Sequence, residues 1–560
     1  MPNDSQIQKF FENKTVCVTG ATGFLGKLLV EKILRTCDIK KMYITMRPKK
    51  NKRIVERMEI YFNSVLFDRL KTERGNVLDK VEVIGADLIL PDLGINESDR
   101  KVLINEVNVM LHNAATVSLD ETLRVAAYTN VRGTEELLKL CTELKHLISV
   151  VYVSTAYSNC IKSETQEEFY TPPLTSGELL TIVNAFDDKT LEAITPHILG
   201  SWPNTYVFTK SIAEECVRQM GSKLPITVVR PSIVACTAAE PVRGWIDNYY
   251  NITGVFVGVS LGVIRTLNCN ANCVGDLIPA DYVVNLLLVA AAKVPGRQNE
   301  DVPIYHCVTS YQNQITWNDV RNYNSFYSET FPTHLQMWHM MCVLSTNKHM
   351  FALFSFALHT VPAYAIDFVL LYLGKSRQAV MKYQKISKFV NVLAYFATRQ
   401  WIFDDKNTQN LWGSLNKTDR AIYPFDKGML PTTCYIHSDT THALAGGQLL
   451  TLKQNKFSLL RNEVFFNLVV RQLMLLKTCC YYPHMMTFGK IPEEKFSLRE
   501  CFVRIGKSQS VFVNIVKAKE WKLSSIKWLI MVGCLAIGFY KAEIIHKTIV
   551  NDNRLHSLAY

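Results

Sequence analysis

The sequence lacks several features that would assign the protein to a common class. It contains no zinc-ligand spacing, no RNP-type segment and no long basic arm, so the net charge of +12 does not indicate a nucleic acid partner. Charged residues make up only 20% of the chain, whereas hydrophobic residues make up 48%. This balance describes a globular protein with additional apolar surface. Phosphorylated small molecules and membrane surfaces remain as acidic partners, and we expect no metal site.

The first residues, MPNDSQIQKFFENK, lack the apolar core of a secretory signal. The 15 cysteines are scattered, with Cys17 inside a predicted strand and Cys479 next to Cys480, so they do not form a disulfide framework. We therefore expect a reducing compartment and a chain that starts in the cytosol. At 560 residues the chain is too long for one ordinary core, and two or more domains are expected.

The segment TVCVTGATGFLG, residues 15–26, is followed by apolar residues at helical spacing. A strand, a glycine turn and a helix in this order are typical of dinucleotide binding. Gly20 permits the turn, Gly23 lets backbone amides approach a phosphate, and Gly26 lets helix and strand pack closely. The helix N-terminus then favours a pyrophosphate. A glycine turn of another α/β protein is the less favoured alternative.

Further predicted strands alternate with helices along the first half of the chain. The strands fall at 41–47, 81–88, 107–115, 148–160, 227–234 and 304–308, and helices are expected at 130–141, 204–217 and 276–292. This alternation predicts a Rossmann-type, doubly wound parallel sheet in an α/β domain.

Arg47 ends the second predicted strand, where a dinucleotide fold meets the adenosine ribose. A basic residue there tolerates the extra phosphate of NADP, so Arg47 favours NADPH. Asp87 ends the third predicted strand, where adenine is often bracketed, and Asn113 and Ala114 follow the fourth. His112 is more consistent with a structural role than a catalytic one.

Tyr206 and Lys210 are four residues apart, so a helix projects them from one face. A tyrosine with a pKa near ~10 is a poor acid at neutral pH unless a cation stabilises its anion. Lys210 supplies that cation and can also hold the nicotinamide ribose. Thr155, in preference to Ser154, would donate a hydroxyl hydrogen bond to the substrate oxygen. Tyrosine and lysine at this spacing are common by chance, and the upstream fingerprint makes this pair specific.

Residues 350–373 form an apolar segment long enough to cross a bilayer. Pro362 lies near its middle, and Asp367 would be costly at the bilayer centre. A bent hairpin that dips into one leaflet and a buried helical pair that lines an acyl pocket therefore stay open beside a span. Residues 377–520 are mostly helical in pattern.

A second apolar segment, WLIMVGCLAIGFY, lies between Lys527 and Lys541. The two lysines can snorkel, and Trp528 and Tyr540 stand at its edges as in an interfacial belt. We expect a C-terminal transmembrane anchor at residues 526–541.

Several segments carry a resemblance to the animal-type, alcohol-forming fatty acyl-CoA reductases. They are TGATGFLG (19–26), RPKK (47–50), HNAA (112–115), YVSTAYSN (152–159), YVFTK (206–210), VRPSIV (229–234), GWIDN (244–248), DLIPADYVVN (276–285), VPAYAIDFVL (361–370) and the WIFDDKNTQNLW to YPFD run (401–426). The GWIDN loop, the proline-alanine segment and the WIFDD run are the most specific to the family. The chain departs from the family pattern at YYNITG after GWIDN and beyond Asp426, two regions where the resemblance implies contact with the acyl chain or the membrane.

The resemblance implies an extended short-chain dehydrogenase/reductase domain followed by a mainly helical, membrane-associated C-terminal domain. The implied boundaries are 13–320 for the NADP-binding thioester reductase domain, 350–376 for the membrane-associated segment and 350–450 for the C-terminal reductase domain. The implied catalytic residues are Tyr206, Lys210 and Thr155. The implied cofactor-binding residues are Gly20, Thr22, Gly23, Phe24, Leu25, Gly26, Arg47, Asp87, Asn113, Ala114, Lys210 and Pro231.

The resemblance also implies the reaction, in which NADPH reduces a long-chain acyl-CoA through an aldehyde to a primary alcohol with release of CoA. Expected partners are the acyl-CoA and membrane lipid, and a homo-oligomer stays open. The catalytic domain is expected to face the cytosol at the endoplasmic reticulum or the peroxisome. Two alternatives remain: a membrane-bound reductase of hydroxysteroids or sugar nucleotides, and a non-catalytic lipid-binding protein with a reductase fold.

Overall fold

The computed structural model describes residues 4–47, 54–221, 223–248, 251–296, 301–330, 336–372, 374 and 376–429. The chain divides into two compact units, Met1–Gly446 and Gly447–Tyr560, and every described residue belongs to the first. The expected anchor at 526–541, residues 430–520 of the region expected to be mostly helical, and the end of the 350–450 region lie outside the described residues.

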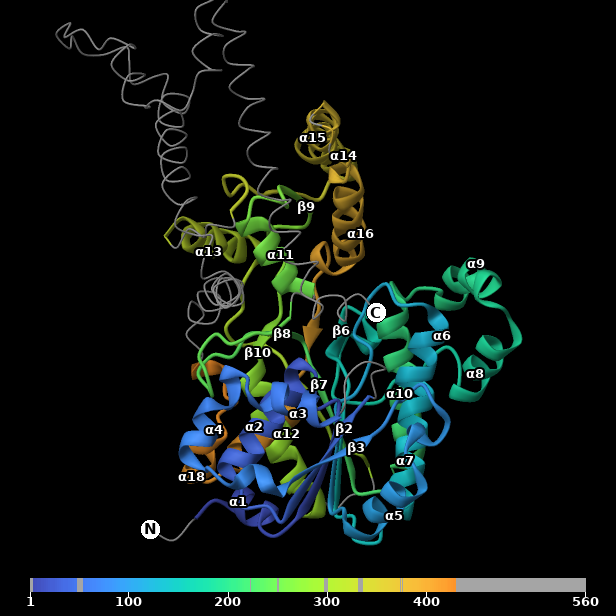
Figure 1. The fold of residues 1–560 in the computed structure, drawn as a ribbon, viewed down its shortest axis with the longest axis vertical. Coiled ribbons are helices and arrows are strands. Elements are labelled where there is room, and N and C mark those ends of the chain that lie inside the picture. The colour runs from blue at the N-terminus through green and yellow to red at the C-terminus, as the bar shows by residue number, and fades with distance from the viewer. Residues whose placement is uncertain are drawn as a thin grey trace, which may run out of the picture. The chain divides into compact units, whose positions relative to one another are not determined.

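A seven-stranded sheet with the order β11-β7-β5-β4-β1-β2-β3 forms the centre of the first unit (Figure 1). All neighbouring strands in it are parallel. Strand order reverses beside β1, as in dinucleotide-binding folds. The predicted Rossmann-type sheet is therefore confirmed. Its strands are β1 (Thr15–Thr19), β2 (Lys41–Met46), β3 (Val81–Gly85), β4 (Val109–His112), β5 (Ser149–Val153), β7 (Ile226–Pro231) and β11 (Ile304–Cys307).

Helices cover both faces of this sheet because alternate strand residues point to opposite sides. Val16 and Val18 of β1 join the core formed with α2 (Phe24–Thr36) and α12 (Ala280–Lys293). Cys17 between them joins the core formed with α7 (Gly133–Glu143) and α10 (Thr205–Met220), and α5 (Glu97–Glu106) adds to that layer. Figure 1 shows the sheet between these two sets of helices.

Several observed strands are shorter than predicted. The prediction of a continuous strand at 148–160 is wrong, because β5 ends at Val153 and a 3-10 turn, η5, follows at Ala156–Asn159. The Thr155 hydroxyl accepts a hydrogen bond from the Tyr157 amide and caps that turn. The predicted helix at 130–141 begins with a π-helical turn, η4 (Ala127–Arg132).

Smaller elements complete the described part of the chain. Parallel two-stranded pairs are β8 (Ile233–Ala235) with β10 (Leu277–Pro279), β9 (Thr266–Asn268) with β12 (Val343–Ser345), and β6 (Glu164–Thr165) with β13 (Ile402–Phe403). Other helices are α1 (Gln6–Phe11), α3 (Ile54–Phe62), α4 (Asp68–Glu73), α6 (Leu123–Ala126), α8 (Ser176–Ala185), α9 (Asp188–Leu199), α11 (Asn251–Ser260), α13 (Trp317–Thr330), α16 (Ala379–Ala397), α17 (Lys406–Gly413) and α18 (Lys417–Ile422).

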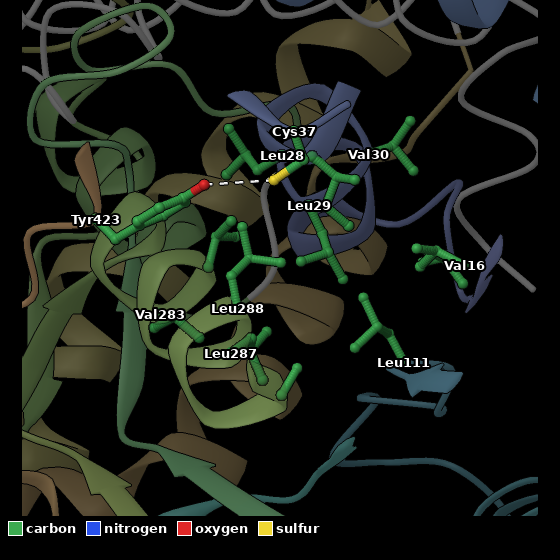
Figure 2. Close-up of a cluster of buried hydrophobic side chains, with 14 of the residues drawn as sticks. Val16, Leu28, Leu29, Val30, Cys37, Leu111, Val283, Leu287, Leu288 and Tyr423 are labelled. Carbon is green, nitrogen blue, oxygen red and sulfur yellow. Dashed lines mark hydrogen bonds between the residues drawn. The ribbon is translucent and has the colours of Figure 1, made fainter. Parts of the chain in front are cut away.

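The segment after α18 packs back on the first strand-helix unit (Figure 2). Tyr423 is fully buried in the core that α2 and α12 share, and its hydroxyl lies 3.3 Å from the Cys37 thiol. Asp419 accepts the hydroxyl of Ser5, which precedes α1, at 2.5 Å. Residues of the C-terminal region thus complete the core of the dinucleotide-binding sheet.

The described part of the apolar segment at 350–373 lies in one helix, Lys348–Tyr372, rather than in a hairpin. Its parts are α14 (Lys348–Ser355), the π turn η7 (Phe356–Thr360) and α15 (Val361–Tyr372). The π turn ends two residues before Pro362, whose missing amide hydrogen interrupts ordinary helical bonding. By length and composition this helix could cross a membrane, a test that a core helix of a soluble protein also passes.

Candidate active site

The glycine turn between β1 and α2 has no room for side chains. Gly20 has a φ of +69°, and a Cβ there would lie 2.7 Å from the Ala114 backbone. A Cβ on Gly26 would lie 2.1 Å from the Gly20 carbonyl oxygen. Gly23 precedes α2 in an extended conformation, and no side chain caps the helix N-terminus. The free amides of this N-terminus fit the pyrophosphate of a dinucleotide.

Residues that follow β4 lie directly against this turn. The Asn113 side-chain amide donates to the Gly20 carbonyl at 3.4 Å, and the Ala114 amide donates to the Thr19 hydroxyl at 3.2 Å. His112 is buried between Thr19 and Thr134, and burial lowers its pKa to about 3, with the positive charge of Lys210 acting in the same direction. A neutral, doubly hydrogen-bonded imidazole has the structural role expected for it.

Arg47 directly follows β2, and its guanidinium Nε lies 3.3 Å from the Asp87 carboxylate. Asp87 lies two residues beyond the end of β3, so the two side chains meet at the carboxyl edge of neighbouring strands. The Arg47 side chain is 54% exposed. It therefore keeps surface for a second anionic partner. Residues 48–53, which include the last three residues of the RPKK segment, lie outside the described residues.

Tyr206 and Lys210 occupy the first turns of α10, as predicted. The helix begins after Asn204, whose side-chain oxygen accepts the Val207 amide at 3.1 Å. The ammonium of Lys210 donates to the Val153 carbonyl at 2.7 Å and stands 4.3 Å from the centre of the Tyr152 ring. The lysine is thereby held at the carboxyl end of β5.

The electrostatics of this pair depend on burial. Burial lowers the pKa of Lys210 to about 7, and the negative charge of Glu214 opposes that shift. Burial raises the pKa of Tyr206 to about 12, while a hydrogen bond with Thr155 acts in the opposite direction. A protonated tyrosine beside a lysine that titrates near neutrality is suited to proton transfer.

Thr155 and Ser154 have different partners, although they are adjacent at the end of β5. The Thr155 hydroxyl interacts with Tyr206 and lies 3.5 Å from the carbonyl of Pro231, the last residue of β7. The Ser154 hydroxyl donates to the buried carboxylate of Glu214. Thr155 is therefore the hydroxyl that faces the tyrosine.

Sequence reasoning did not find Glu214, which lies one helical turn after Lys210. Its carboxylate accepts Nε of Arg230 at 2.9 Å and Nη2 at 2.7 Å, in a pair that is nearly inaccessible to solvent. It also accepts the Ser158 hydroxyl at 3.1 Å. The feature of the sequence that could have identified Glu214 is its spacing of four residues from Lys210, which places both side chains on one face of the helix.

Aromatic and aliphatic side chains surround Tyr206 and the loop after β5. The indole of Trp401 donates to the Cys160 carbonyl at 2.9 Å, and the Tyr157 ring packs edge-on against Trp401 and Phe403. Tyr206 is partly buried against this cluster, together with Trp202, Ile233, Tyr395 and Phe396. The WIFDD run thus supplies an apolar wall beside the tyrosine.

A doubly wound parallel sheet with this glycine turn and a tyrosine-lysine pair beyond β5 defines an oxidoreductase of the short-chain dehydrogenase/reductase type that uses a nicotinamide cofactor. Two family models, both described as "Male sterility protein", match residues 18–287 and 358–441. The chain is 35% identical over 424 residues to fatty acyl-CoA reductase wat of Drosophila melanogaster, covering 76% of this chain and 82% of the relative. It is 34% identical over 433 residues to fatty acyl-CoA reductase 1 of Rattus norvegicus, covering 77% and 84%. The chain belongs to the fatty acyl-CoA reductase family.

Solved structures support the fold. A reductase domain of a nonribosomal peptide synthetase from Mycobacterium tuberculosis matches with a TM-score of 0.53 at 18% identity, covering 80% of this chain and 96% of that one. The terminal R domain of the myxalamid PKS-NRPS pathway matches with a TM-score of 0.51 at 19% identity, covering 78% and 92%. At such identities the likeness concerns the fold alone.

Proposed function

We propose that the protein reduces long-chain fatty acyl-CoA to a primary alcohol, with NADPH as the reductant, an aldehyde intermediate and release of CoA. The observation that carries the proposal is the meeting of Thr155, Tyr206 and Lys210 at the end of β5 beside apolar side chains. The relatives, which are named fatty acyl-CoA reductases, support the substrate class.

The cofactor would be held by the glycine turn and the edge of the sheet. The amides at the start of α2 would bind the pyrophosphate, Arg47 the 2′-phosphate, and Lys210 the nicotinamide ribose. Thr22, Phe24, Leu25, Asn113, Ala114 and Pro231 would complete the contacts. When bound, NADPH supplies the hydride for each of the two reductions.

This chain's own groups would manage the charge and the proton. Hydroxyl hydrogens of Thr155 and Tyr206 would stabilise the oxyanion that develops on the thioester carbonyl. Breaking of the carbon-sulfur bond then leaves aldehyde and CoA thiolate, which takes up a proton. In the second reduction, Tyr206 would donate its proton to the alkoxide, and the Lys210 cation would stabilise the tyrosinate.

We further propose that the catalytic unit works at the cytosolic face of a membrane, where long-chain substrates and products partition. The apolar helix Lys348–Tyr372 supports membrane association. Aromatic side chains around Tyr206 would shield the aldehyde from water.

The test uses purified full-length protein in detergent with NADPH and acyl-CoAs of graded length. Cofactor oxidation, thiol release and lipid products are followed for wild type and Tyr206→Phe. Tyr311→Phe is the matched control, because Tyr311 is 58% exposed in the described part of the chain. We expect fatty alcohol from wild type and control and none from Tyr206→Phe. Absence of NADPH oxidation with every acyl-CoA would overturn the proposal, and turnover of a hydroxysteroid without thiol release would favour the alternative reductase.

A further inference from the structure

Helix Lys348–Tyr372 has two chemically different faces. Among the described side chains of this helix, eight large apolar ones are exposed, including Phe368 at 70% and Tyr372 at 87%. We call this set the apolar face: Met350, Leu353, Phe356, Val361, Tyr364, Phe368, Leu371 and Tyr372. From Met350 to Leu371 the spacing of three or four residues is broken once, between Phe356 and Val361, where the π turn η7 adds a residue and keeps both on one side. Tyr372 directly follows Leu371 at the end of the helix.

The opposite face is buried and carries two polar side chains, those of His359 and Asp367. His359, Ala363, Ile366 and Asp367 are all at most 9% exposed. Asp367 accepts the amides of Gln378, Ala379 and Val380 at 2.9, 2.8 and 3.1 Å, and so caps the N-terminus of α16. Such a carboxylate is stabilised by the helix dipole.

His359 ties the same face to another part of the protein. Its Nε2 accepts the Arg265 amide at 2.9 Å, and the Arg265 guanidinium donates to the Tyr383 hydroxyl of α16 at 2.9 Å. The helix is therefore bonded at its middle and near its end to α16 and to the start of β9. If it crossed a bilayer, it would carry Arg265 and the lysines of α16 into the hydrocarbon with it.

The surroundings of the apolar face are cationic. Between residues 336 and 400 the only acidic residue is Asp367, and it is used as the cap. Lys348 is an exposed cation at the start of the helix, and Arg377 is one that follows its end. Helix α16 carries two more exposed cations, Lys385 and Lys388. Apolar side chains next to exposed cations complement a surface that is both apolar and anionic.

We infer that helix Lys348–Tyr372 lies flat in the interface of an anionic lipid membrane and does not cross it. The apolar face enters the boundary between headgroups and acyl chains of one leaflet, while His359 and Asp367 keep their bonds within the protein. Lys348, Arg377 and the α16 lysines contact the headgroups. This inference deepens the proposed membrane association and does not depend on the chemistry at Tyr206.

The first test measures sidedness in the full-length protein. It is reconstituted in phosphatidylcholine vesicles with phosphatidylserine, and Thr346→Cys and Ser376→Cys, both at exposed positions, are treated with a membrane-impermeant maleimide. Labelling is read for each peptide by mass spectrometry, with Lys101→Cys as the marker for the side of the reductase unit. We expect all three positions to be labelled from the same side. Labelling of positions 346 and 376 from opposite sides would overturn the inference.

The second test measures lipid contact. The photoreactive amino acid p-benzoylphenylalanine replaces Phe368 or, as the matched control, Phe326 of α13, which is 60% exposed. Lipid adducts are counted by mass spectrometry in vesicles with and without phosphatidylserine. We expect at least about fivefold more adduct at 368 than at 326, and more with the anionic lipid. Equal yields at both positions would overturn the inference. Turnover of the same preparations in detergent separates such a failure from a failure of the proposed reductase activity.

Discussion

The carboxylate of Glu214 receives a two-pronged hydrogen bond from Arg230, with N–O distances of 2.9 and 2.7 Å. The same carboxylate accepts hydroxyls from Ser154 and Ser158, which flank Thr155. Because Glu214 lies on α10 with Tyr206 and Lys210, the loop that carries Thr155 is anchored to the helix that carries the proposed acid. We therefore expect Glu214 to act as a positioning residue.

Removal of one partner of the buried Glu214–Arg230 pair should lower both the stability and the activity of the protein, and a double variant should separate the two effects. Glu214→Gln leaves the Arg230 charge unpaired, which costs about 3–5 kcal/mol for pairs of this kind. The double variant Glu214→Met with Arg230→Met replaces the pair by apolar groups and should recover much of the stability. It should not recover turnover, because Ser154 and Ser158 lose their anchor.

Thermal unfolding and kcat are measured for both variants. Glu97→Gln, which breaks the exposed pair with Lys101, serves as control and should change stability by at most about 0.5 kcal/mol. If the double variant regains full turnover together with stability, Glu214 has only a structural role.

The activity should depend on the charge of Lys210. Because burial lowers its pKa to about 7, the cationic fraction in the free enzyme decreases as the pH rises through neutrality. In the second reduction, the tyrosinate formed after proton donation is then less stabilised, so kcat/KM for a long-chain aldehyde supplied as substrate should fall between about pH 6 and pH 8. Glu214 opposes the shift, so Glu214→Gln should move this fall to lower pH.

Lys210→Arg is the matched control for that profile. A guanidinium stays protonated throughout, and the residual activity of this variant should show no fall near neutrality. Identical pH profiles for wild type and Lys210→Arg would contradict the assignment.

Local sequence patterns predicted the part of the site that is contiguous in the chain. The turn is predicted from three glycines, Gly20, Gly23 and Gly26. Each is needed because the backbone of one strand-helix unit requires a positive φ or a close approach at that position. Tyr206 and Lys210 share a helix face by spacing alone. Such features need no knowledge of the rest of the fold.

Features set by distant partners were missed or left open. Ser154, which follows the end of β5, donates to Glu214, 60 positions away in the chain. The local pattern at 148–160 contains no sign of such a partner and therefore predicts one continuous strand. The helix at Lys348–Tyr372 has the composition of a span, and only its contacts with Arg265 and α16 distinguish its two faces. Hydropathy averages over both faces and cannot report that difference.

Arg47 should determine the choice between NADPH and NADH. Arg47 directly follows β2, its side chain is half exposed, and the carboxylate of Asp87 orients its guanidinium. Arg47→Gln should raise KM for NADPH at least about tenfold, because a charge-assisted contact to the 2′-phosphate is lost, and should leave KM for NADH unchanged. Steady-state kinetics with both cofactors check this, with Lys101→Gln as a surface control. Equal changes for both cofactors would place Arg47 outside the 2′-phosphate site.

Gly26 offers the sharpest test of the glycine turn, because the space for a side chain is absent there. In Gly26→Ala the new Cβ would lie 2.1 Å from the Gly20 oxygen and 2.7 Å from the Ala21 Cα, both backbone atoms. The start of α2 must then move away from the turn, which should cost about 1–3 kcal/mol of stability and weaken NADPH binding at least about tenfold.

Gly177→Ala makes the same chemical change in α8, where nothing lies within 4 Å of the new Cβ. That variant should be neutral or gain up to about 1 kcal/mol, since alanine is favoured over glycine in a helix. Thermal unfolding and NADPH titration by fluorescence distinguish the two. Normal NADPH affinity in Gly26→Ala would mean that α2 does not deliver its N-terminal amides to the pyrophosphate, and the cofactor would then have to be held at another edge of the sheet.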